Sequence, residues 1–357
     1  MRVLQVIASL EPGGAERMVV QLAADAREHG HEVAVASAGG AWVPRLGCVP
    51  HHAVPLIARS RTGLLRTAAA LHALVRELRP DVVHSHNVGV TVAAQLALAA
   101  ARSPAPLVTT VHGLAHEDYP SAARLLRLTR ALVVSCAPAV DRALGAAGLP
   151  PARRTVVVNG AALQEASAQR VAAVREVHCL RGRVVVGLGR LVEQKAWGTL
   201  VEAARSLDED VDVVVAGQGP LLEPLRRQAD AAGGRVRFIG AVDDVAALLA
   251  TASCLVSTSS WEGLPLSLLE ALSLGVPAVA TSVDGVVDVV LEDTALLVPP
   301  GEPAAVAGAL RRVLDEPGTA QALSSAALRA RDGWAPQRML DAYRDLYARV
   351  LREPRRR

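Results

Sequence analysis

The sequence predicts an α/β protein built from two domains, each of them a doubly wound parallel sheet. The chain has 357 residues, more than the roughly 100–200 residues that one domain usually holds. In each half, short runs rich in β-branched residues alternate with Ala- and Leu-rich helical stretches, and the alternation breaks off near Asn159 and Gly160. Such alternation gives a parallel sheet with helices on its faces. We therefore expect one sheet on each side of the break.

The first half begins with a strand over Val3–Ile7, a glycine-rich turn, and a helix from about Ala15 to His29. A second helical pattern covers Leu64–Leu78. The remaining apolar runs have the length and composition of buried strands. They cover Val33–Ala36, Asp81–His84, Leu107–Val111 and Leu132–Ser135.

The second half starts after a polar, Ala-rich stretch over residues 161–182, which we interpret as a linker and a short helix. Its strands are expected over Val184–Gly187, Val211–Ala216, Val236–Ile239, Cys254–Ser257 and Ala278–Ala280. The last helical stretch, Trp334–Leu351, is amphipathic and is expected to cross back to the first domain. The predicted domains are 1–165, joined by a C-terminal helix over 336–357, and 166–335. Two Rossmann-like halves of this kind face a cleft, and their ligands bind beyond the carboxyl ends of the strands.

Charge is distributed unevenly along the chain. The formal net charge is +3, but residues 1–160 carry 16 arginines and 10 acidic residues, whereas the rest carries 22 basic and 25 acidic residues. Aromatic residues do not alternate with the basic ones, which argues against a nucleic-acid-binding protein. The basic excess of the first half favours a weak attraction to an anionic surface such as a membrane.

The cysteines and the apolar runs both indicate a soluble, cytoplasmic protein. The four cysteines are scattered and form no C-x-x-C pair, which fits reduced thiols better than a metal site or disulfides. The apolar run at the start is shorter than a signal-peptide core, and Glu11–Gly14 ends it. Apolar windows elsewhere fall short of the roughly 20 residues that a membrane span requires.

One basic residue differs from all the others. Of the 38 basic side chains, 37 are arginine and one, Lys195, is lysine. It lies in the stretch GLGRLVEQKAW, shortly after the strand Val184–Gly187 and after Arg190, where we expect it to begin the next helix. A guanidinium fork and a compact ammonium near a helix N-terminus are suited to a doubly charged group such as a diphosphate. The alternative is a solvated surface lysine.

Two further stretches follow strands of the second half. The residues Gly217-Gln218-Gly219-Pro220 predict a tight turn, and WEGLPLSLLE follows the strand Cys254–Ser257. In the latter, Pro265 fits the first turn of a helix, so Glu262 lies in the loop and Glu270 about two turns along the helix. A buried, unpaired carboxylate is costly. Glu270, among leucines, therefore indicates a polar ligand such as a ribose diol, with an exposed helix glutamate as the alternative.

In the first half, polar groups also follow the strands. Gly13 and Gly14 let a ligand approach the backbone at the start of a helix, although a plain turn explains them equally well. The histidines His84, His86 and His112 lie at the ends of two strands that we expect to be neighbours. We interpret them as pointing to the cleft. A metal site is the weaker interpretation, because no carboxylate or cysteine is close to them in sequence.

With these residues assembled, the chain resembles the retaining, nucleotide-sugar-dependent glycosyltransferases of glycosyltransferase family 4, which have the two-domain GT-B fold. The most specific part of the resemblance is the paired-glutamate motif from Glu262 to Glu270. The stretches Gly189-Arg190-Leu191 with Lys195, Gly217–Pro220, Arg237–Gly240 and Leu297–Gly301 support it. The resemblance extends along essentially the whole chain. It implies a donor-binding second domain and an acceptor-side first domain.

The resemblance implies a role for each candidate residue. Arg190 and Lys195 hold the diphosphate of the donor, Glu270 holds the ribose, and Glu262 contacts the donor sugar and phosphate together with the backbone amides from Gly263 to Leu266. The remaining donor-binding positions follow from the same motifs: Gly13, Gly14, Gly217, Phe238, Ile239, Leu264 and Pro265. His112 faces the sugar ring, so the implied catalytic groups are His112, Arg190, Lys195 and Glu262. The resemblance implies no metal and no cofactor; the nucleotide diphosphate sugar, commonly UDP-linked, is a co-substrate.

The chain departs from the family pattern at three places. Ala196 follows the lysine where the family often has glycine, and no proline precedes Asn159-Gly160. The usual Gly-Gly-x-Pro-Glu loop is replaced by Asp284-Gly285-Val286-Val287-Asp288. These departures put the local geometry near the donor and the hinge in question, and leave the phosphate and ribose assignments in place.

Three other functions are compatible with parts of the sequence. A non-hydrolysing nucleotide-sugar 2-epimerase shares the architecture but needs acid and base groups for which only the histidines are candidates. A dinucleotide oxidoreductase is disfavoured because the first turn lacks G-x-G-x-x-G. A catalytically silent partner subunit is disfavoured by the presence of Arg190, Lys195, Glu262 and Glu270.

The acceptor is not specified by any motif. Arg59, Arg61 and Arg66 lead into a helix and permit a lipid-linked acceptor at the inner face of a membrane. A small-molecule acceptor, such as an antibiotic aglycone or an aminocyclitol, is the alternative, with these arginines simply solvated.

Overall fold

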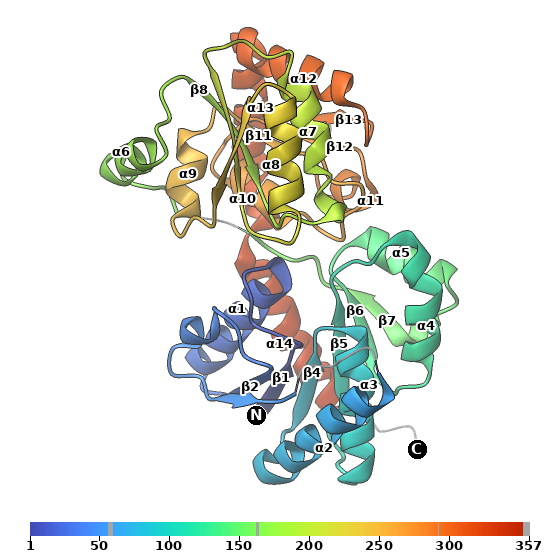
Figure 1. Cartoon of the computed structure of the whole chain (residues 1–357). Helices are drawn as coiled ribbons and strands as arrows, with labels where there is room; N and C mark the ends of the chain where they lie inside the picture. The colour runs from blue at the N-terminus through green and yellow to red at the C-terminus, as the bar shows by residue number, and fades with distance from the viewer. Residues whose placement is uncertain (56–59, 162–163, 292, 353–357) are drawn as a thin grey trace. The chain divides into compact units, whose positions relative to one another are not determined.

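Two parallel sheets organise the chain, as the computed structural model shows (Figure 1). The structure describes residues 1–55, 60–161, 164–291 and 293–352. The chain divides into two compact units. Unit 1 comprises Met1–Asn159 together with Gln337–Arg357, and unit 2 comprises Gly160–Pro336.

Unit 1 is built on a sheet whose described strands follow the order β3-β2-β1-β4-β5-β6-β7, all parallel. The strands are β1 Arg2–Val6, β2 Glu32–Ser37, β3 His51–Ala53, β4 Val82–Ser85, β5 Leu107–Val111, β6 Leu132–Ser135 and β7 Arg154–Val156. The helices are α1 Gly14–Glu28, α2 Arg61–Leu78, α3 Val88–Ala100, α4 Tyr119–Arg127, α5 Pro138–Ala146 and α14 Pro336–Arg352. The strand order reverses between β1 and β4, the place where ligands bind in such sheets.

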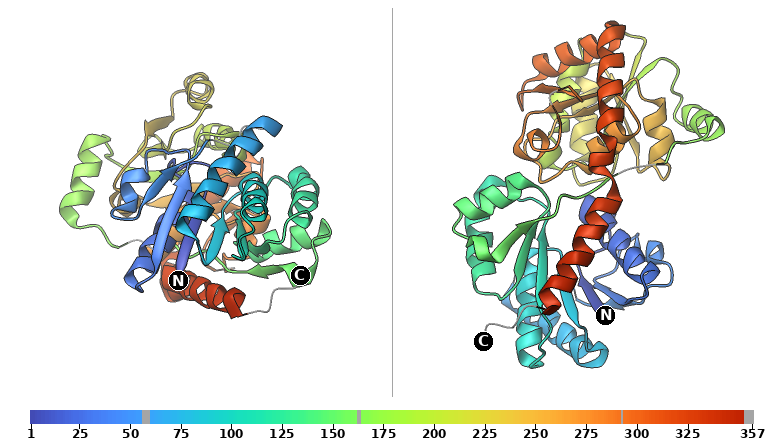
Figure 2. Two further views of the ribbon diagram at one scale, coloured as in Figure 1. Left: turned by 90° about the horizontal axis from the view of Figure 1, so that it is seen from below. Right: turned by 180° about the vertical axis from the view of Figure 1, so that it is seen from behind.

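Helices cover both faces of the unit 1 sheet. On one face, α1 and α14 pack through Met18, Leu22, Met339 and Tyr343 against buried valines of the sheet. On the other face, α2 and α3 pack through residues such as Leu71 and alanines of α3. Figure 2 shows α14 running along the sheet of unit 1. Parallel strands buried on both faces need near-continuous apolar runs, which explains the valine-rich segments of the sequence.

Unit 2 repeats the design with the described strand order β10-β9-β8-β11-β12-β13, again all parallel. The strands are β8 Arg183–Leu188, β9 Val211–Ala216, β10 Val236–Gly240, β11 Cys254–Ser257, β12 Ala278–Thr281 and β13 Leu296–Val298. The helices are α6 Ala168–Val177, α7 Trp197–Ala204, α8 Leu222–Ala231, α9 Val245–Thr251, α10 Leu266–Ser273, α11 Asp284–Val287, α12 Pro303–Asp315 and α13 Pro317–Ala330. Here the strand order reverses between β8 and β11. The loops after these two strands carry Arg190, Lys195 and Glu262.

The expected sheets and the long helices are confirmed, and the differences lie at short elements. The three-residue strands β3, β7 and β13 were not expected, because a run of three residues has no pattern of its own and is stabilised by pairing with its neighbour. Lys195 does not begin a helix: it ends the short 3₁₀ helix η4 (Glu193–Lys195), and α7 begins at Trp197. Pro265 precedes α10 rather than lying in its first turn, and its carbonyl accepts the first helical hydrogen bonds, from Leu268 and Leu269.

Candidate functional site

A buried ion pair joins the loop after β8 to the loop after β11 in unit 2. The Lys195 Nζ atom donates to Glu262 Oε1 at 2.6 Å, and the two side chains are 14% and 5% exposed. Ser259 Oγ donates to the same carboxylate oxygen at 2.6 Å, and Gln194 Nε2 donates to the other oxygen at 3.3 Å. Burial of a charge is tolerated only when it is paired and hydrogen-bonded. These partners therefore hold both oxygens of Glu262 and fix the direction of the ammonium group.

Backbone contacts hold the same two loops together. The Ser260 amide donates to the Gln194 carbonyl at 2.8 Å, and Thr258 Oγ1 donates to the Lys195 carbonyl at 3.0 Å. Ala196 has a left-handed backbone, with φ at 44°. A non-glycine residue is uncommon in this region, so the residue after the lysine retains the conformation for which glycine is best suited.

Arg190 presents a second cation from the loop after β8. Its side chain is exposed, and no other side chain in the described part of the chain forms a hydrogen bond or ion pair with its guanidinium. Its carbonyl accepts a hydrogen bond from Trp197 Nε1 at 3.0 Å, and Trp197 is buried in the core of unit 2. The backbone at Arg190 is thus anchored while the five N–H donors of its side chain stay available.

The residues from Glu262 to Glu270 form one loop and the helix that follows it. Glu262 lies in the loop after β11 and Glu270 lies in α10, as expected from the sequence. Gly263, Leu264 and Pro265 are buried, Leu266 is half-buried, and Glu270 is only 3% exposed. The altered stretch from Asp284 forms the short helix α11, whose Gly285 packs on this loop. A Cβ atom on Gly285 would lie 2.4 Å from the Glu262 carbonyl oxygen, so this close approach requires glycine.

Three strand ends of unit 2 meet beside this loop. A Cβ atom on Gly217, after β9, would lie 1.9 Å from the Gly189 carbonyl oxygen, so only glycine fits where these turns touch. The Gly217 amide donates to the Gly240 carbonyl at the end of β10 at 2.8 Å. Phe238 and Ile239 of β10 are half-buried, and Phe238 packs against the core. Gly217 thus follows β9, the strand next to β8, and Phe238 and Ile239 lie on β10, the strand beyond β9.

The candidate residues of unit 1 follow β1 and β5, the strand at the reversal of the strand order and the second strand beyond it. Gly13 precedes α1 and Gly14 begins it, after β1. His112 follows β5, and its Nε2 lies 3.4 Å from Nδ1 of His86, which follows β4. Burial lowers the pKa of His112 to about 4 and keeps its imidazole neutral at pH 7.

The expectation for His84 and His86 was wrong in one respect. They do lie at the end of a strand adjacent to β5, but they do not point out of the protein: they are 0% and 1% exposed. His84 Nε2 contacts Thr110 Oγ1 at 2.8 Å, and His86 Nε2 contacts Gln5 Oε1 at 2.6 Å. Burial lowers the pKa of His84 to about 3 and the pKa of His86 well below its ordinary value. Their ring nitrogens are occupied inside the protein.

Sequence reasoning missed the residues that support the ion pair. Ser259 and Gln194 are neighbours in sequence of Glu262 and Lys195, but no pattern identifies them, since 68 positions separate Gln194 from Glu262. Among the described residues, no group of three or more His, Cys, Asp or Glu side chains has the arrangement of a metal site. None of the helices in the described part of the chain combines the length and apolarity that a bilayer span requires.

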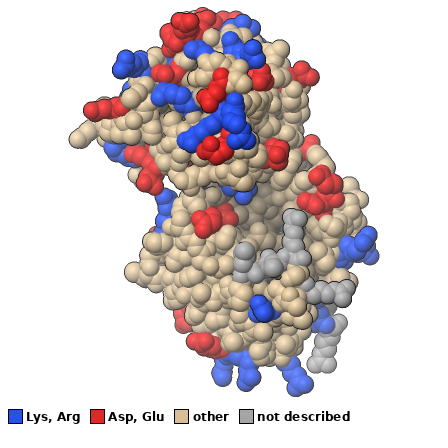
Figure 3. All heavy atoms as spheres, in the orientation of Figure 1, with Lys and Arg blue, Asp and Glu red and all other residues tan. Residues whose placement is uncertain are grey.

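The charged surface bears on partners of unit 2. Figure 3 shows basic and acidic side chains side by side on the visible face of this unit. A mixed surface of this kind gives little long-range attraction of a single sign. In unit 1, Arg66 is exposed, whereas Arg59 and the side chain of Arg61 lie outside the described residues.

The chain matches known proteins over nearly all of its length. Residues 12–165 match the family model described as Glycosyltransferase Family 4, and residues 176–330 match that of Glycosyl transferases group 1. The chain is 30% identical over 343 residues to the 2-deoxystreptamine N-acetyl-D-glucosaminyltransferase of Streptomyces fradiae, covering 82% of this chain and 80% of that protein. It is 29% identical over 332 residues to the phosphatidyl-myo-inositol mannosyltransferase of Mycolicibacterium smegmatis, covering 85% and 82%.

A solved structure has the same fold. Alr3699/HepE from Anabaena, in complex with UDP and glucose, superposes with a TM-score of 0.86 at 21% identity, covering 97% of this chain and 99% of that chain. The expected fold class and family are thereby confirmed. The chain belongs to glycosyltransferase family 4 and is a glycosyltransferase of the GT-B fold.

Proposed function

We propose that this enzyme transfers a hexose or amino-hexose from a UDP-linked sugar to a small-molecule or lipid-linked acceptor, with retention of configuration and without a metal or other cofactor. The observation that carries the proposal is the placement of Arg190 and Lys195 in the loop after β8, with the Lys195 ammonium held by buried Glu262. Both cations follow a strand at the reversal of the strand order, where such sheets bind ligands.

The two cations suit the charge that develops in the reaction. Breaking the anomeric C–O bond leaves a diphosphate with growing negative charge, and fixed cations lower the barrier when they lie where that charge appears. An ammonium has three N–H donors. One donates to Glu262, which leaves two for phosphate oxygens while the carboxylate sets their direction. Arg190 adds a planar fork for a second phosphate oxygen pair. In this proposal these two side chains supply the positive charge that a divalent metal supplies elsewhere.

The other assignments complete the donor site. Glu270, buried in α10, binds the ribose diol, and the backbone amides from Gly263 to Leu266 bind phosphate and sugar. Phe238, Ile239 and Gly240 of β10 lie along the base, and Gly217, after β9, also contacts the donor. Gly13 and Gly14 contact the phosphate side and His112 contacts the sugar ring.

Relatives support the donor and the acceptor class. The Anabaena protein was solved with UDP and glucose, which favours UDP as the nucleotide. The two named relatives act on 2-deoxystreptamine and on phosphatidyl-myo-inositol, a small aminocyclitol and a lipid. We propose a cytoplasmic location, at the inner face of the membrane where the acceptor is a lipid.

The deciding experiment is a thermal-shift panel of UDP, GDP and ADP. A ligand at about 100 times its dissociation constant stabilises the protein that binds it by roughly 2.7 kcal/mol. We expect UDP to raise the melting temperature most. If none of the three raises it, the nucleotide site is wrong; a larger shift with GDP or ADP replaces the UDP assignment alone.

Turnover assays test the rest. With donor and acceptor present, the anomeric configuration of the product, read by NMR, should match that of the donor, and excess EDTA should leave the rate unchanged. With donor alone, inversion of the sugar at carbon 2 would instead indicate the epimerase.

A further inference from the structure

A chain of buried polar side chains connects His112 to the C-terminal helix within unit 1. His112 Nε2 lies 3.4 Å from His86 Nδ1, and the two rings are stacked. His86 Nε2 lies 2.6 Å from Gln5 Oε1 on β1, and Gln5 Nε2 donates to Tyr347 OH on α14 at 3.1 Å. A residue of β1, the residues that follow β4 and β5, and a helix that is distant in sequence thus contribute to one hydrogen-bonded series.

Beyond Tyr347 the series of hydrogen bonds continues through His84 and Thr110 to Tyr343. Tyr347 OH lies 2.7 Å from His84 Nδ1, and His84 Nε2 lies 2.8 Å from Thr110 Oγ1. Thr110 Oγ1 lies 2.7 Å from Tyr343 OH. The side chains of this continuation are fully or almost fully buried. Buried polar groups bond to one another where bulk water does not reach them, so the direction of each hydrogen bond is set by its neighbours.

The direction can be followed from Gln5. Its amide nitrogen donates to Tyr347, so its carbonyl oxygen is the acceptor and His86 Nε2 must carry a proton. A neutral imidazole has one donor and one acceptor nitrogen. His86 Nδ1 is therefore an acceptor, and His112 Nε2 must donate to it. The remaining nitrogen of His112, Nδ1, is left with a lone pair.

We infer that Gln5, His86 and Tyr347 are positioning residues that fix His112 as the tautomer protonated on Nε2, so that its Nδ1 accepts a hydrogen bond from a substrate hydroxyl. The inference that this hydroxyl belongs to a sugar rests on the proposed function. The inference about the tautomer rests on the hydrogen-bond network alone. The unprotonated Nδ1 of His112 can accept a hydrogen bond from a hydroxyl. It cannot donate one to a phosphate oxygen, which is itself an acceptor. The burial that lowers the pKa of all three histidines supports the neutral state.

The tautomer can be observed directly. In protein labelled with ¹⁵N-histidine, at pH 7, His112 should show an unprotonated Nδ1 and a protonated Nε2, with its signals assigned by their loss in His112→Asn. A protonated Nδ1 would overturn the inference, because it would mean that the Gln5 amide is reversed and every donor in the series runs the other way. A doubly protonated ring would overturn it as well.

Two substitutions of His86 separate positioning from packing. His86→Gln can still accept from His112 and donate to Gln5, whereas His86→Leu fills the space without either bond. We expect His86→Gln to preserve the ¹⁵N signature and most of kcat/KM. His86→Leu should lose the signature and lower kcat/KM roughly tenfold or more, the effect of one lost hydrogen bond of typical strength. Equal signatures and equal kcat/KM in the two variants would overturn the role of His86.

A matched pair on α14 tests the far end of the series. Tyr347→Phe removes the hydroxyl that accepts from Gln5, and Tyr343→Phe removes a hydroxyl on the same helix that reaches the network only through Thr110. Only Tyr347→Phe should shift His112 toward the other tautomer. If both variants change the His112 signals alike, α14 acts by packing and the positioning role of Tyr347 is wrong.

Deoxyfluoro donors test the hydroxyl. Fluorine in place of the recognised hydroxyl cannot donate a hydrogen bond. For one such analogue, kcat/KM of the wild type should therefore be about tenfold lower than for the unmodified donor, whereas His112→Ala should use the two donors equally well. The absence of any analogue with this behaviour would refute the hydroxyl contact. Binding of UDP with a wrong tautomer would refute this inference alone, and the right tautomer without nucleotide binding would refute the proposed function alone.

Discussion

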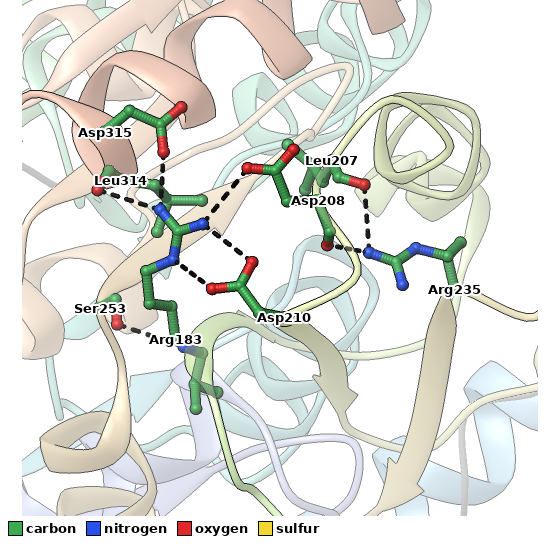
Figure 4. Close-up of polar contacts among 9 residues, drawn as sticks. Arg183, Leu207, Asp208, Asp210, Arg235, Ser253, Leu314 and Asp315 are labelled. Atoms are coloured by element: carbon green, nitrogen blue, oxygen red, sulfur yellow. Dashed lines mark hydrogen bonds and ion pairs between the residues drawn. The ribbon is translucent and has the colours of Figure 1, made fainter.

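The two ends of strand β8 carry arginine in opposite circumstances. At the start of the strand, Arg183 donates to Asp210 at 3.0 and 3.1 Å, to Asp315 at 2.6 Å and to Asp208 at 3.4 Å (Figure 4). Its hydrogen bonds to Asp210 and then to Asp315 raise the pKa of Arg183 above its ordinary value. The start of the strand therefore holds more negative than positive groups, and the Arg183 guanidinium is fully used.

At the end of the strand the cations are not fully paired. The loop carries Arg190 and Lys195, and Lys195 pairs with Glu262, a buried carboxylate that accepts from three protein donors. At the start of β8 the Arg183 side chain is 32% exposed and is paired with nearby aspartates. The loop after the end of β8 retains N–H donors, on Arg190 and Lys195, that the described residues do not use. The same strand thus has a structural end and an end at which we propose that the diphosphate binds. A binding site is therefore indicated by N–H donors that no protein group uses, and not by the number of charged side chains.

The largest effect should come from breaking the ion pair between Lys195 and Glu262, beyond the end of β8. Lys195→Met removes a cation from the proposed diphosphate site, and we expect turnover to fall about 100- to 1,000-fold. Because the buried Glu262 then lacks its counter-ion, unfolding free energy should also fall, by about 3–5 kcal/mol. Steady-state kinetics and denaturant unfolding measure the two effects separately.

A second substitution separates stability from activity. In Lys195→Met with Glu262→Gln, no unpaired charge is buried, so most of the lost stability should return while turnover stays low. Wild-type turnover in Lys195→Met would contradict the phosphate assignment. Recovery of turnover in the double variant would show that the lysine serves only to neutralise Glu262.

Much of the fold could be predicted from sequence because buried parallel strands require runs such as Val184–Gly187. The short strand His51–Ala53 could not be, since it depends on pairing with β2. In the site, Lys195 was identifiable as the single lysine and Glu262 by its motif. Their direct contact spans 67 positions and depends on the order of β8 and β11 in the sheet. The burial of His86 likewise depends on the distant helix α14, which covers that face of the sheet.

A smaller effect is expected at the exposed cation. Arg190→Ala should weaken UDP binding about 10- to 100-fold, the loss expected for hydrogen bonds to a charged group. Arg190→Lys keeps the charge and loses the fork, so its affinity should lie between the two. Calorimetric titration with UDP measures all three proteins. Because Arg190 has no side-chain partner in the described part of the chain, the melting temperature without ligand should not change. A fall in that temperature with unchanged affinity would make Arg190 structural, like Arg183.

The smallest effect is expected at Arg183, at the start of β8. Arg183→Ala removes bonds to partners that are 46% to 69% exposed, and exposed ion pairs contribute little to stability. We expect the melting temperature to fall by no more than about 4 °C, and less in high salt, which already screens these charges. Affinity for UDP and turnover should match the wild type, since no donor at the other end of β8 is changed. A loss of UDP affinity in Arg183→Ala as large as that in Arg190→Ala would remove the distinction between the two ends, because it would show that the strand transmits the change or that the nucleotide binds at its start.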